Sequence, residues 1–72
     1  MRYFFHVVGL QANYRDDEGS EFIRAEDAMA HAAVIARELE EDGNLDGYWI
    51  VVVDKDQTEI GRVLVGSEKP SP

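Results

Sequence analysis

Two histidines and a short acidic segment are the residues of this 72-residue chain that could support acid–base chemistry. His6 stands in an apolar stretch, and the acids Asp16, Asp17 and Glu18 follow at the next turn signal. An imidazole close to a carboxylate can transfer protons or hold a metal ion near neutral pH. A histidine among apolar residues is more often a buried polar group, and adjacent acids in a turn are usually solvated. His6 with Asp16 and Asp17 is therefore a candidate polar site, although a structural role is favoured.

The second histidine, His31, lies in a helical pattern with Asp27 and Glu38 at helical spacing. An exposed histidine paired with these carboxylates is the ordinary explanation. The chain has no cysteine, and two histidines alone do not form a zinc site. The sequence therefore predicts no catalytic residue, no metal site and no cofactor.

Residues 42–47, with the sequence Asp-Gly-Asn-Leu-Asp-Gly, match the first half of a calcium-binding EF-hand loop. The position that needs a closing glutamate is occupied by Val53, within an apolar run. A helix end followed by a turn requires the same residue types. We therefore interpret this segment as a helix end and a loop.

Aromatic side chains are the candidates for contact with a partner protein. They are enriched at binding hot spots because a large apolar body and a polar tip can both be used. The same residues could equally fill the core of a sheet, and that interpretation is favoured. The candidate interface residues are Tyr3, Phe5, Tyr48 and Trp49.

One helix is predicted from Ala25 to Asp42. Glu26 and Asp27 suit the positive end of its dipole, and Gly43 can adopt the left-handed conformation that ends a helix. Its apolar residues recur at helical spacing and form one stripe, which is rich in alanine and can approach a sheet closely. The stripe consists of Ala25, Ala28, Met29, Ala32, Ile35, Ala36 and Leu39.

Strands are predicted on both sides of this helix. Residues 2–8 and 48–53 are dense in aromatic and β-branched side chains, and residues 59–65 complete a hairpin with the second of these runs. Residues 10–23 contain short strand pieces that return to the first strand. The pattern predicts an α+β fold of type ββαββ, a four-stranded and mainly antiparallel sheet with the helix across one face.

Composition indicates one small cytoplasmic domain over residues 1–65, followed by a disordered C-terminal tail over residues 66–72. The N-terminus has no signal-peptide pattern, and no stretch reaches the roughly 20 apolar residues that span a bilayer. Fifteen acidic residues against seven basic ones give a formal charge of −8. This charge disfavours nucleic acid and membrane surfaces as partners and allows a basic protein.

The predicted helix can cover only one of the two faces of the sheet. Both faces of strands 2–8 and 48–53 are apolar, so neither face suits water. We expect a second copy of the chain on the uncovered face, or paired edge to edge about a two-fold axis. The alternative is that residues 10–23 of the same chain cover it.

The opening residues Arg2-Tyr3-Phe4-Phe5-His6-Val7 resemble a family of short bacterial proteins classed only as a domain of unknown function. The acidic turn Asp16-Asp17-Glu18-Gly19, the alanine-rich helix and the closing hairpin around Val53-Asp54 extend the resemblance to about Val65. The resemblance implies a similar small α+β domain. Because the family has no assigned activity, it implies no substrate or reaction.

These observations together predict a small non-catalytic module that binds another protein or serves as an accessory, and that acts as a homodimer. The alternative is a small-ligand binder or an enzyme whose site forms between two chains. In that case His6 and an acid from residues 16–18 would supply the polar pair.

Overall fold

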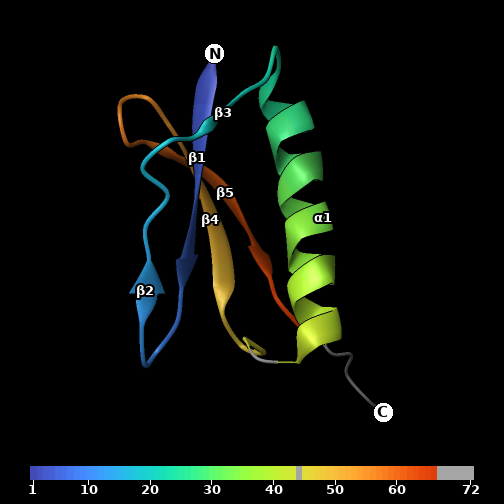
Figure 1. Cartoon of the computed structure of the whole chain (residues 1–72). Helices are drawn as coiled ribbons and strands as arrows, with labels where there is room; N and C mark the ends of the chain where they lie inside the picture. The colour runs from blue at the N-terminus through green and yellow to red at the C-terminus, as the bar shows by residue number, and fades with distance from the viewer. Residues whose placement is uncertain (44, 67–72) are drawn as a thin grey trace.

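The computed structural model describes residues 1–43 and 45–66 of the chain, which form one sheet and one helix (Figure 1). Of the predicted tail, only Gly66 lies within the described residues. The elements in chain order are β1 (Arg2–Val8), β2 (Asn13–Tyr14), β3 (Ser20–Glu21), α1 (Ala25–Asp42), β4 (Trp49–Asp54) and β5 (Glu59–Leu64). This order confirms the predicted α+β class.

The sheet is antiparallel throughout, with the order β2-β1-β4-β5. It has five strands because the predicted second strand consists of two short pieces, β2 and β3. Both pair with β1, one near each of its ends. Residues 10–23 therefore extend the edge of the sheet beside β1, as Figure 1 shows.

Helix α1 begins and ends where its sequence pattern predicts. Arg24 at its N-terminus makes no side-chain capping bond. The feature that stabilises this end is the interaction of Glu26 and Asp27 with the positive end of the helix dipole. At the other end Gly43 has φ of 72°, and its N–H donates to the carbonyls of Leu39 and Glu40. No helix in the described part of the chain is long and apolar enough to cross a lipid bilayer.

The alanine stripe of α1 packs on one face of the sheet, mainly over β4 and β5 (Figure 1). Ala28, Ala32 and Ala36 are buried. Gly61 on β5 allows this approach, because an added Cβ would lie 2.8 Å from Cε of Met29. The buried alanines of α1 allow the helix to lie close to the sheet.

The core lies between α1 and this face of the sheet. β1 contributes Tyr3 and Phe5, and the register places Phe5 opposite Val52 of β4. Ile50, Val52 and Val65 are fully buried there. The residues between these positions along β1 and β4 point to the other face of the sheet.

Candidate functional site

The structure brings His6 and Asp16 together at the edge of β1. The backbone N–H of Asp16 donates to Nδ1 of His6 at 3.0 Å. In return, the N–H of Phe5 donates to the carboxylate of Asp16 at 3.1 Å. Nδ1 must therefore carry no proton, which leaves Nε2 as the only nitrogen of His6 with a proton to donate.

The carboxylate of Asp16 accepts two more backbone hydrogen bonds, from Glu18 at 3.2 Å and Gly19 at 3.1 Å. Burial alone would raise the pKa of Asp16, but these bonds, together with that from Phe5, lower it overall. Asp16 thus fills the gap along β1 between its pairings with β2 and β3. Its contacts are those of a structural residue.

Asp17 does not join this cluster. Its carboxylate lies 3.4 Å from Nε of Arg15, and both side chains are largely exposed. The predicted polar set therefore divides into a pair that closes a loop, His6 and Asp16, and a solvated ion pair. No reacting group is positioned by this arrangement.

His31 differs from the exposed histidine that the sequence suggested. It is half-buried, and its ring lies 5.1 Å from that of Phe5 and 5.2 Å from that of Phe22. No ion pair joins His31 to a carboxylate among residues 1–43 and 45–66. The prediction of carboxylate pairing was wrong because the imidazole of His31 packs against the rings of Phe5 and Phe22.

The four candidate interface residues lie in three different places. Tyr3 and Phe5 are in the core beneath α1, with exposed fractions of 4% and 7%. Tyr48 is half-buried at the entry to β4, where its ring stacks on that of Tyr14 at 6.4 Å. Trp49 is on the opposite face of the sheet and is 36% exposed. An interface role stays a prediction for Tyr48 and Trp49, the two at the surface.

The face of the sheet away from α1, which we call the open face, carries apolar side chains along β1 and β4 with ion pairs toward its edges. Val51 and Val53 lie at its centre and are almost fully buried by their neighbours. The guanidinium of Arg62 lies 5.6 Å from the ring centroid of Trp49, and it also bonds the carboxylate of Glu59. From β1, β4 and β5 the open face comprises Arg2, Phe4, His6, Val8, Trp49, Val51, Val53, Glu59, Arg62 and Leu64.

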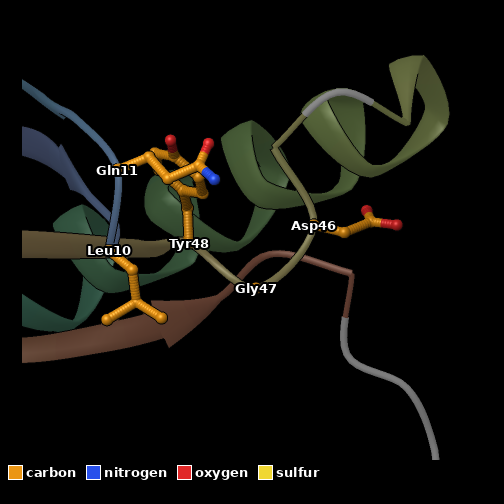
Figure 2. Close-up of a pocket in the computed structure, with 5 residues that line it drawn as sticks. All are labelled: Leu10, Gln11, Asp46, Gly47 and Tyr48. Carbon is orange, nitrogen blue, oxygen red and sulfur yellow. The ribbon is translucent and has the colours of Figure 1, made fainter.

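Two pockets lie at the end of the sheet where α1 terminates. One is a shallow cleft between the β1–β2 turn and the segment that enters β4, lined by Leu10, Gln11, Asp46, Gly47 and Tyr48. Figure 2 shows Gln11 beside Tyr48, whereas the carboxylate of Asp46 points away from both. The polar groups of this cleft do not converge on a common point.

The second pocket lies between α1 and β2 and has a volume of about 300 Å³. Its lining is mainly apolar and consists of Val7, Tyr14, Leu39, Asp42 and Leu45. Sequence reasoning placed Leu39 on the buried stripe of the helix but did not connect it to Tyr14 or Leu45. Only the fold brings together residues so far apart in the chain.

The family model described as "Domain of unknown function (DUF6894)" matches residues 2–66. The chain belongs to this family. The match covers every helix and strand of the DUF6894 fold seen here, and it confirms the resemblance found in the sequence. Comparisons with curated proteins and with solved structures gave no match.

The described part of the DUF6894 domain has few clustered polar side chains. Within residues 1–43 and 45–66, no polar or charged residue is buried and no three potential metal ligands cluster. The one close imidazole–carboxylate pair is occupied by backbone hydrogen bonds. The features suited to binding are the open face and the apolar pocket beside α1.

Proposed function

We propose that the protein is a non-catalytic binding module that acts as a homodimer, with two copies packed through their open faces. The observation that carries this proposal is the apolar character of the open face. Half-buried Val8 and Leu64 flank the exposed Trp49 on the neighbouring strands. Half-buried Phe4 lies at the other end of the same face, opposite Val53. Contiguous apolar surface rimmed by polar groups is typical of protein interaction sites.

The distribution of charge supports a second copy as the occupant. Helix α1, on the other layer, carries six carboxylates and a single cation, Arg37. On the open face the guanidinium of Arg62 bonds the carboxylate of Glu59. The guanidinium of Arg2 lies 3.2 Å from the carboxylate of Glu21, so the cations of this face are paired with carboxylates of the same face. Two open faces can therefore meet while the acidic helices stay on the outside of the pair, where salt screens their repulsion.

The size of the open face sets the expected strength of the dimer. Three six-residue strands span about 20 Å by 14 Å, which is small for a stable protein interface. We therefore expect monomer and dimer to exchange at concentrations of tens to hundreds of micromolar, roughly.

The test is the mass in solution by sedimentation across this concentration range, for the wild type and two variants. Trp49→Ala removes the most exposed ring of the open face. Val34→Ala is the matched control, because Val34 is 52% exposed on the outer side of α1. We expect the wild type and Val34→Ala to dimerise at the same concentration and Trp49→Ala to remain monomeric.

Fluorescence gives a second measurement, since Trp49 is the only tryptophan of the chain. Burial of its ring against a second copy should move its emission to shorter wavelength as concentration rises. A wild type that stays monomeric at all concentrations would overturn the proposal, as would a dimer that persists in Trp49→Ala.

A further inference from the structure

The apolar pocket beside α1 exists because the helix lies over β4 and β5 and leaves β2 uncovered. Val7 forms its floor on the helix-facing side of β1, Leu39 of α1 forms one wall, and Tyr14 of β2 forms the other. The pocket thus lies on the helix side of the sheet, opposite the open face. It is complete within a single chain.

The lining of this pocket suits an aliphatic group. Val7, Leu39 and Leu45 are half-buried and pack against the core, so their positions are fixed. Tyr14 is held by its stacking on Tyr48. The volume of about 300 Å³ is at the lower limit for pockets that enclose a small molecule. One branched aliphatic side chain is therefore a better fit than a larger ligand.

The rim of the pocket is negatively charged. Asp42 lines it directly, and the C-terminal end of α1 adds the negative end of the helix dipole. No basic residue lies in the last turn of the helix. The carboxylates of the last two turns are Glu38, Glu40, Glu41 and Asp42. A second copy of this acidic chain would be repelled here, whereas a cation would be attracted.

We propose that this pocket binds an aliphatic side chain from a basic protein segment, with lysine or arginine side chains placed next to Asp42. This inference rests on the proposed role as a binding module and names the class of partner. It does not need the dimer, because one chain supplies the whole pocket. Apolar anchoring with charged flanks is a common form of peptide recognition.

The probe is a fluorescein-labelled peptide in which one leucine is flanked on each side by lysine and arginine, and binding is measured by fluorescence anisotropy. A second peptide carries serine in place of leucine. We expect the leucine peptide to bind at least about tenfold more tightly, because burial of a leucine side chain lowers the dissociation constant by more than about tenfold. Raising the salt from about 50 mM to about 500 mM should weaken binding severalfold.

Two pairs of variants locate the site. Leu45→Gln should reduce binding about tenfold, whereas Leu10→Gln, the same change at a fully exposed leucine in the neighbouring cleft, should leave it unchanged. Asp42→Asn should weaken binding severalfold, and Asp27→Asn, at the other end of α1, should not. Circular dichroism checks that each variant is folded.

Equal binding of the two peptides would overturn the inference and indicate attraction to an acidic surface alone. No binding of the leucine peptide, or equal losses in Leu45→Gln and Leu10→Gln, would also overturn it. Trp49→Ala, which tests the dimer, should bind the peptide as well as the wild type does. A failure of the pocket and a failure of the dimer are therefore distinguishable.

Discussion

The two faces of the sheet are made of the same kinds of residue but lie in different surroundings. Phe5 and Val52 point toward α1 and are in the core, whereas their chain neighbours Phe4 and Val51 point to the open face. The helix covers the first pair. The second pair has no helix above it. The ring of Phe4 lies beside that of His6 and close to Gly19. Val51 pairs with Arg62 across the strands. Side chains of similar composition therefore form the core on one face and lie without a covering helix on the other.

The neighbouring phenylalanines give the sharpest test of this difference. Phe5→Ala should lower the free energy of unfolding by about 3–5 kcal/mol, because a nearly buried ring is lost from the core. Phe4→Ala should lower it by only about 1 kcal/mol, since the ring is half-buried. Urea unfolding of the monomer, followed by circular dichroism, measures both. Equal losses would show that the open face is packed as tightly as the core.

Asp16 tests whether the loop beside the open face is held by its carboxylate. Asp16→Ala should lower the free energy of unfolding by about 1–3 kcal/mol, because it leaves the N–H groups of Phe5 and Gly19 without their acceptor. Asp17→Ala is the control and should change it by no more than about 0.5 kcal/mol. Hydrogen exchange at the Phe5 amide should accelerate only in Asp16→Ala. Unchanged exchange there would mean that another group protects this edge.

The pH dependence of stability tests the same contact through Asp16→Asn, a substitution that keeps the size of the side chain. The pKa of Asp16 is lower in the folded chain than in the unfolded chain, so the unfolded state binds its proton first as pH falls. The contribution of Asp16 is therefore present at neutral pH and is lost on acidification through the lowered pKa. Between about pH 7 and pH 2, the wild type should lose more stability than Asp16→Asn. Parallel curves would contradict the lowered pKa.

The smallest effect is expected at Arg62, at the rim of the open face. Arg62→Ala should barely change the unfolding midpoint, because the ion pair with Glu59 is exposed to solvent. It should change the emission of Trp49, whose ring the guanidinium covers. Arg37→Ala, on the outer side of α1, should change neither. A large loss of stability would show that Arg62 holds the open face together.

Much of the fold could be predicted because its signals are local. The bounds of α1 follow from alanine periodicity and from Gly43, and the strands β1 and β4 follow from dense β-branched and aromatic runs. The weak segment of residues 10–23 was predicted only as strand pieces. Between its two short strands, the N–H of Phe5 donates to the Asp16 carboxylate and the N–H of Asp16 donates to His6, contacts that no local pattern indicates.

The candidate site was less predictable than the fold. The sequence suggested that His6 and Asp16 could meet, but it gave no sign that backbone N–H groups would occupy both side chains. It also grouped Tyr3 and Phe5 with Trp49 as aromatic candidates. Residue type alone does not distinguish a ring beneath the helix from one on the open face.

By itself the sequence determined the elements of this protein, their order and the alternation of side chains along each strand, because these depend on short-range periodicity and backbone preference. Only the tertiary structure decided which of two equally apolar faces α1 covers, and where residues 10–23 lie. Burial of apolar surface has no direction of its own, so two similar faces are equivalent until the chain connections place α1 over one of them. The face left uncovered is the one we propose as the interface.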